Sequence, residues 1–241
     1  MKNKNKKSGF TLLELLIVVA IMAILSVVMI IILDPAETLK KSRDSQRMSD
    51  LNTLKTAIGI YLTATSSPQL DNYGSICLDG TTNSGKISYS IADMGACNNN
   101  ISEGADANGT FTATDFCDSP TAASGNLNKV NGSGWIPVPF SGLTGGSPIS
   151  NLPIDPINTV TSVTAPTTTD MVYRYACQET GSGAKPGKAF ELDARLESAA
   201  YGPGGAEDKS ARDGGDNNNL YEVGSSVFLM GSDTGSATLG Y

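Results

Sequence analysis

One ionisable side chain lies where a charge is costly. Glu14 stands near the start of an apolar run, residues 10–33, whose other polar members are Thr11 and Ser26. A carboxylate inside an apolar helix costs several kcal/mol unless it is paired, so Glu14 requires a cationic partner. The alternative is a solvated carboxylate at the level of the lipid headgroups.

A second group of polar side chains, near the C-terminus, could bind a metal ion. Asp213, Asp216 and Asn218 bring oxygen ligands close together in the sequence, and Gly214 and Gly215 allow tight folding of the backbone. Ca²⁺ prefers such oxygen ligands. The sequence therefore predicts that this loop binds calcium, with an ordinary polar surface turn as the alternative.

Histidine is absent from the 241 residues, which excludes a Ser-His-Asp triad, a Cys-His pair and histidine-ligated metals. An enzyme would have to work through paired carboxylates, and no pair is distinguishable from the other acids of the sequence. The formal net charge of −7 argues against binding to nucleic acid through a basic face. The sequence thus predicts a protein with no catalytic activity and no required cofactor.

Four cysteines, Cys77, Cys97, Cys117 and Cys177, lie far apart in the sequence. Outside the membrane they predict two disulfides, for which three pairings exist. We favour a bridge from Cys177 to one of the other three, because it would tie a loop-rich region to a strand. The wide spacing lacks the C-x-x-C pattern of zinc sites.

The apolar run has a basic flank on its N-terminal side. Residues 1–9 carry four lysines and no acid, and residues 10–33 are long enough, at ~1.5 Å per residue, for a helix to cross the ~30 Å core of a bilayer. The basic flank predicts a cytoplasmic N-terminus and places the rest of the chain outside. A secretory signal would be shorter, with ~7–15 apolar residues, and would end in an A-x-A-like site.

The succession of basic leader, Gly9, Phe10, Glu14 and long apolar run resembles the N-terminus of type IV pilins and the related pseudopilins. The resemblance implies that a prepilin peptidase cuts after Gly9 and that Phe10 becomes the N-methylated first residue. It implies that Glu14 pairs with the N-terminal amine of a neighbouring subunit during assembly. The helix over 10–33 would then anchor the precursor in the membrane and later form the filament core.

Residues 34–65 are expected to continue as an amphipathic helix. Asp34 and Pro35 are typical of a helix start, although Pro35 could equally kink one continuous helix. Apolar residues at helical spacing then predict a face for burial against a domain: Leu51, Leu54, Ile58, Tyr61 and Leu62. A preceding basic cluster could bind anionic lipid, DNA or acids of neighbouring subunits, or face solvent: Lys40, Lys41, Arg43 and Arg47.

Residues 66–241 are expected to form a globular head. Residues 173–177 and 190–197 alternate apolar and polar side chains, which predicts a half-buried antiparallel strand pair with one polar face. Further strand candidates are residues 86–91, 110–114, 220–223 and 227–230. A sheet laid across the second half of the helix gives an α+β fold with disulfide-stapled loops, the architecture that the pilin resemblance implies.

These observations predict a structural subunit of a type IV pilus or pseudopilus, matured by prepilin peptidase and assembled with other pilin subunits by a platform in the inner membrane. The precursor would be a single-pass membrane protein, and the mature form an extracellular or periplasmic filament. DNA binding is not indicated. The other interpretation is a membrane-tethered adhesin, carbohydrate-binding or enzymatic head that uses the helix only as an anchor.

Overall fold

The computed structural model describes residues 9–72, 77, 87–91, 126–161, 167–179 and 187–230. These residues contain two long helices, a four-stranded sheet and two short 3-10 helices, η1 at Phe140–Gly142 and η2 at Ser210–Arg212. The chain forms two compact units, Met1–Lys40 and Lys41–Tyr241. The α+β class expected from the sequence is confirmed.

The first helix, α1, spans Leu12–Leu33. Thr11 is its N-cap: the Thr11 hydroxyl accepts a hydrogen bond from the Glu14 N–H, and the Glu14 carboxylate accepts one from the Thr11 N–H. This reciprocal arrangement satisfies two of the amides that a helix start leaves unpaired. The helix ends at Asp34, whose φ of 34° lies in the left-handed region.

The second helix, α2, spans Pro35–Ala64. Pro35 is its first residue, where a missing N–H is tolerated, and Asp34 Oδ1 accepts a hydrogen bond from the Glu37 N–H at 3.2 Å. A single residue, Asp34, therefore separates the two helices. The apolar face of α2 is buried much as its spacing predicted, with Leu62 only half-buried; its buried apolar members are Leu51, Leu54, Ala57, Ile58 and Tyr61.

The sheet is an antiparallel meander with the strand order β1-β2-β3-β4. Its strands are β1 Ser88–Tyr89, β2 Tyr173–Gln178, β3 Ala189–Ala194 and β4 Tyr221–Gly224. β2 and β3 are the strand pair that the alternation predicted. Of the other candidates, 86–91 contains β1 and 220–223 overlaps β4, whereas 227–230 is not a strand and 110–114 lies outside the described residues.

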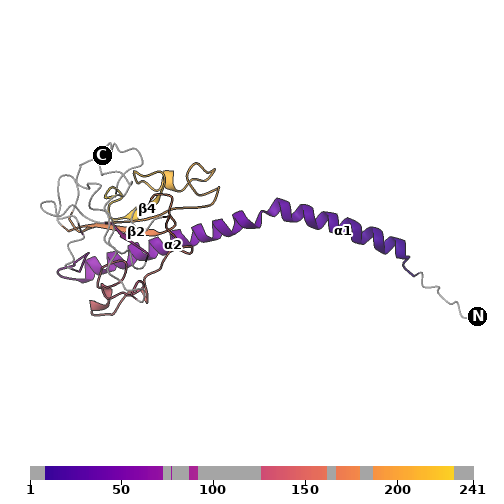
Figure 1. Ribbon diagram of the computed structural model, residues 1–241. Coiled ribbons are helices and arrows are strands. Elements are labelled where there is room, and N and C mark those ends of the chain that lie inside the picture. The colour runs from indigo at the N-terminus through magenta and orange to yellow at the C-terminus, as the bar shows by residue number, and fades with distance from the viewer. Residues whose placement is uncertain are drawn as a thin grey trace, which may run out of the picture. The chain divides into compact units, whose positions relative to one another are not determined.

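One face of the sheet packs on α2, and Figure 1 shows β2 running beside this helix. Tyr173, Tyr175 and Leu192 project from this face into the main core. The same core takes in Trp135, which is fully buried and donates its indole N–H to the Pro153 carbonyl at 2.8 Å. All these residues belong to the second compact unit, so the core of the head is built without α1.

The opposite face of the sheet corrects the expectation of a half-buried strand pair. All six residues of β2 and all six of β3 are buried. Leu229 and Met230, from the segment after β4, belong to a second apolar cluster with Val172 and Ala176 on this face. The covering residues come from a distant part of the chain, which the alternation within a strand cannot reveal.

A disulfide joins Cys77 to Cys177 on β2, across 100 residues of sequence. This confirms the prediction that Cys177 is bridged to the region of the other three cysteines. Cys97 and Cys117 lie outside the described residues. A cross-link over so long a loop stabilises the fold mainly by restricting the unfolded chain.

We expect the double variant Cys77→Ser, Cys177→Ser to lower the free energy of unfolding by about 4–5 kcal/mol, the loop-closure value for ~100 residues. The measurement is urea unfolding followed by the fluorescence of Trp135, the single tryptophan. An emission spectrum equal to that of the parent in native buffer would show that the variant starts from the same fold. Unchanged unfolding would contradict a stabilising role of the bridge.

Candidate functional site

Gly9 and Phe10 precede α1 in an exposed, non-helical segment. Phe10 is 80% exposed, and a Cβ built on Gly9 would meet no heavy atom within 4 Å. The peptide bond between them is therefore accessible to a protease. Because the packing around position 9 leaves room for a side chain, a requirement for glycine there would come from the protease.

Glu14 lies in the first turn of α1, and its carboxylate is bonded within its own chain. Oε2 accepts hydrogen bonds from the Thr11 N–H at 3.0 Å and from the Thr11 hydroxyl at 2.8 Å. Both donors are neutral, so they orient the carboxylate without neutralising its charge. The site is thus an exposed, preoriented anion three residues inside the start of an apolar helix.

The apolar residues of α1 are exposed to the surroundings on every side of the helix. The exposed fraction of its described large apolar side chains ranges from 46% at Val18 to 81% at Leu12. By length and by a mean hydropathy of 3.4, the helix can cross a membrane. Because an all-round apolar helix is unstable in water, α1 must be covered by lipid or by other protein chains.

The guanidinium of Arg47, on α2, lies inside the head among three carboxylates. It donates from Nε and Nη2 to the two oxygens of Asp155 at 2.6 and 2.9 Å, and from Nη1 to Asp44 at 2.9 Å and Glu197 at 2.8 Å. Arg43 adds a bidentate pair to Glu197 at 2.6 and 2.9 Å. We call these five side chains the Arg47 network.

The charges of the Arg47 network stabilise one another. Burial disfavours the charge of Arg47, but its bonds to Asp155, Glu197 and Asp44 outweigh burial and raise its pKa. Burial likewise opposes the charge of Glu197, yet hydrogen bonds from Arg43 and Arg47 hold the pKa of Glu197 below its usual value. Asp44 also accepts two backbone N–H groups just after β3. The network therefore joins α2, the loop at Asp155 and the end of β3.

This network changes the interpretation of the basic cluster of α2. Lipid, DNA, neighbouring subunits and solvent were the expected surroundings, whereas Arg43 and Arg47 bind acids of their own head. Lys40 and Lys41 are half-buried. No local pattern could link Arg47 to Asp155 and Glu197, which lie 108 and 150 residues away.

A second group of buried charges lies on the other face of the sheet. Glu191 and Asp193 on β3 and Glu222 on β4 offer carboxylate oxygens that all lie within 4.8 Å of one another, and each residue is at most 1% exposed. We call these three residues the acidic cluster. The sequence analysis missed it, because Glu222 reaches β3 only through the strand register, which places it opposite Asp193. Carboxylates this close could hold a metal ion.

The three residues predicted to bind calcium surround the turn before β4. Both oxygens of Asp213 accept backbone N–H groups, from Gly215 at 2.9 Å and from Glu222 at 2.7 Å. Asp216 is half-buried and Asn218 is exposed. Asp213 therefore braces the turn, and calcium binding by this trio stays a prediction.

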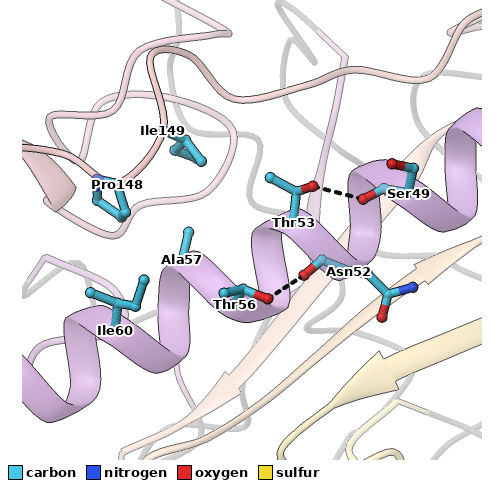
Figure 2. A pocket seen from close by; sticks show the side chains of 8 residues that line it. All are labelled: Ser49, Asn52, Thr53, Thr56, Ala57, Ile60, Pro148 and Ile149. Carbon is cyan, nitrogen blue, oxygen red and sulfur yellow. Dashed lines mark hydrogen bonds between the residues drawn. The ribbon is translucent and has the colours of Figure 1, made fainter.

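A groove of about 370 Å³ lies along α2 beside Pro148 and Ile149 (Figure 2). Hydroxyl groups in it are bonded within the helix: Thr53 donates to the Ser49 carbonyl and Thr56 to the Asn52 carbonyl, each at 2.8 Å. None of its eight lining residues is charged. The groove therefore offers a contact surface, without the acid and base that a hydrolytic site would use.

Comparison with known proteins bears on the N-terminal segment. Residues 4–30 match the prokaryotic N-terminal methylation motif, the signature of type IV prepilins, and this range contains Gly9, Phe10 and Glu14. The resemblance to prepilins is thereby confirmed over this segment. No curated protein and no solved structure matches the chain. The motif and the membrane-length helix support a type IV pilin-like or pseudopilin subunit with a membrane-anchored precursor.

We expect Arg47→Met to lower the free energy of unfolding by about 3–5 kcal/mol, because it leaves Asp44, Asp155 and Glu197 without their buried cation. Arg43→Met is the matched control. The Arg43 side chain is 33% exposed, so its loss should destabilise the head much less than the loss of Arg47. Urea unfolding of both variants measures the difference. Equal losses would show that Arg47 is not the centre of the network.

The lowered pKa of Glu197 predicts acid sensitivity. A carboxyl whose pKa is lower in the folded state contributes stability above its unfolded value, here 4.5, and loses it as the pH falls below that value. The unfolding free energy of Glu197→Gln should therefore fall less steeply below pH 4.5 than that of the parent. Glu207→Gln, which removes a carboxylate that is 61% exposed, should follow the parent curve. If the unfolding free energies of the parent and both variants fell in parallel with pH, Glu197 would not be the cause of the acid sensitivity.

Proposed function

We propose that this protein is a structural, non-enzymatic subunit of a type IV pilus or pseudopilus filament. The observation that carries the proposal is the combination, in one segment, of an accessible Gly9–Phe10 bond, a Glu14 carboxylate bonded only to neutral donors, and an apolar helix whose described large apolar side chains are all exposed. An anchor alone needs only the helix. The methylation motif over residues 4–30 supports processing at Gly9 and methylation of Phe10.

In the proposed mechanism, α1 is held in the bilayer until assembly and is then covered by α1 helices of neighbouring subunits. Lipid tails are as apolar as leucine side chains, so the transfer gains little from the hydrophobic effect and depends on close packing between helices. A charge pair between neighbouring α1 helices would set their position along the filament axis. Cleavage would give Phe10 a free amine, and the preoriented Glu14 carboxylate of a neighbour would neutralise it at a fixed axial offset.

The head would then decorate the filament surface. The part of α2 after Lys41 belongs to the same compact unit as the sheet, and the Arg47 network fixes it there. A subunit of this kind needs prepilin peptidase, an assembly platform in the inner membrane and further pilin subunits as partners. Its precursor would keep the N-terminus in the cytoplasm, and the filament would be periplasmic or extracellular.

The test is Glu14→Leu in cells that assemble the parent protein. We expect the variant to reach the membrane at the level of the parent but to fall at least tenfold in the sheared filament fraction, because the amine of the neighbour loses its carboxylate. Mass spectrometry of the parent filaments should give methylated Phe10 as the N-terminus. Ser26→Ala, which removes a hydroxyl bonded to the Met22 carbonyl of the same helix, is the matched control and should assemble normally.

Two outcomes would contradict the proposal. Assembly of Glu14→Leu at the level of the parent would remove the charge pair from the mechanism. Absence of the parent protein from sheared filaments, while it is abundant in the membrane, would favour a tethered head that uses α1 only as an anchor.

A further inference from the structure

The acidic cluster lies where negative charge is hardest to tolerate. Asp193 and Glu222 stand directly opposite each other on β3 and β4, and Glu191 is two residues from Asp193 on the same face of β3. Their exposed fractions are 0%, 1% and 0%. Carboxylates out of water at this separation repel one another strongly unless a proton or a cation joins them.

In each glutamate of the cluster, one carboxylate oxygen accepts backbone N–H groups and the other does not. Oε2 of Glu191 accepts the N–H groups of Leu229 and Met230 at 2.5 and 2.8 Å, and Oε2 of Glu222 accepts the Asn217 N–H at 3.0 Å. Oε1 of Glu191 and Oε1 of Glu222 are buried and accept no N–H or hydroxyl group from the described residues. The two side chains lie within hydrogen-bond reach of each other, and a bond between them requires a proton on one carboxyl group. Buried acceptors of this kind are rare in folded proteins, so these oxygens require a proton, a water molecule or a cation as partner.

Among the described residues, the nearby cations are fewer than the carboxylates on this face of the sheet. Arg174 stands opposite Asp193 on β2, where it donates to the carbonyl oxygens of Thr167 and Val172 and lies over the ring of Tyr89. The guanidinium groups of Arg174 and Arg195, whose charges act on each other, are outnumbered by the three carboxylates of the cluster and Asp216, whose charge acts on Glu191. This face of the sheet therefore carries an excess of buried negative charge.

We propose that Glu191, Asp193 and Glu222 bind a divalent cation of calcium's class inside the head. Oxygens at 2.3–2.6 Å from one ion lie at most about 5 Å apart, and the cluster's oxygens lie within 4.8 Å. The donor set is all carboxylate, which suits a hard cation. Mg²⁺ keeps several waters when it binds, whereas a fully buried cage of protein oxygens suits Ca²⁺.

The turn before β4 closes over this site. Gly215 lies so close to Glu222 that a Cβ at position 215 would collide with the carboxylate. Asp213 accepts the Glu222 N–H, and Asn217 donates to the Glu222 carboxylate. In this arrangement the turn positions a ligand on β4. The site differs in its ligands from the calcium loop expected at Asp213, Asp216 and Asn218.

A shared proton is the competing explanation of the cluster. Burial raises the pKa of Glu191 to about 7, and burial with the charges of Asp193 and Glu191 raises the pKa of Glu222 further. A proton and a cation therefore compete for the same oxygens. The titration is accordingly repeated at rising pH, because binding that displaces a proton should tighten as the pH increases.

The experiment uses the full-length chain in detergent, stripped with chelator and titrated with CaCl₂ by calorimetry. We expect one Ca²⁺ per chain. With Ca²⁺ at about 100 times the dissociation constant, the melting temperature followed by Trp135 fluorescence should rise by about 5–10 °C. Glu222→Gln should weaken binding at least tenfold and should melt no lower than the parent in chelator, because it removes a repelled charge without changing shape.

Asn218→Ala is the matched control. It removes an exposed oxygen of the turn and leaves the acidic cluster intact, so it should bind Ca²⁺ like the parent. Asp193→Asn repeats the test should Glu222→Gln fail to fold. No binding by the parent would establish the shared proton instead. Binding that survives in Glu222→Gln, or that disappears in Asn218→Ala, would place the ion in the turn and overturn the proposal.

Discussion

The positive charge of Arg47 has to be neutralised inside the head, and three separate segments of the chain meet around it to do so. Apolar packing alone would let α2 slide or rotate against the sheet, since one methyl group can replace another. A bidentate ion pair with Asp155 and further bonds to Asp44 and Glu197 permit one position of the helix. The apolar face of α2 packs on the sheet in the position that these bonds favour.

The two compact units differ in where their apolar side chains are buried. The head encloses its own core, including Trp135, the sheet and the buried face of α2. α1 has a capped N-terminus, but its described large apolar side chains are all exposed, so their environment must be supplied from outside the chain. A protein built this way is complete only in a membrane or among copies of its own kind, which is the physical basis for proposing a filament subunit.

Periodicity and composition predicted the helices and strands that are determined by nearby residues in the sequence. The extent of α1 follows from a long and almost wholly apolar run, the buried face of α2 from helical spacing, and β2 and β3 from alternation. The partners of Arg47 and the acidic cluster depend instead on which distant segments meet. Asp155 is 108 residues from Arg47, and Glu222 joins Glu191 and Asp193 only through strand register. The same reason explains why the polar face of β2 and β3 was expected to be half-buried, since its cover comes from Leu229 and Met230.

The Cys77–Cys177 bridge gives the head a covalent topology with a practical consequence at a cell surface. In the filament proposed above, the head would be exposed to secreted proteases, and a long stretch of the head lies between the two bridged cysteines. If one peptide bond in that stretch is cut, the two fragments stay attached, because the disulfide joins Cys77 on one fragment to Cys177 on the other. A nicked subunit would keep its mass and its place in the filament, and the cut would be seen only after reduction.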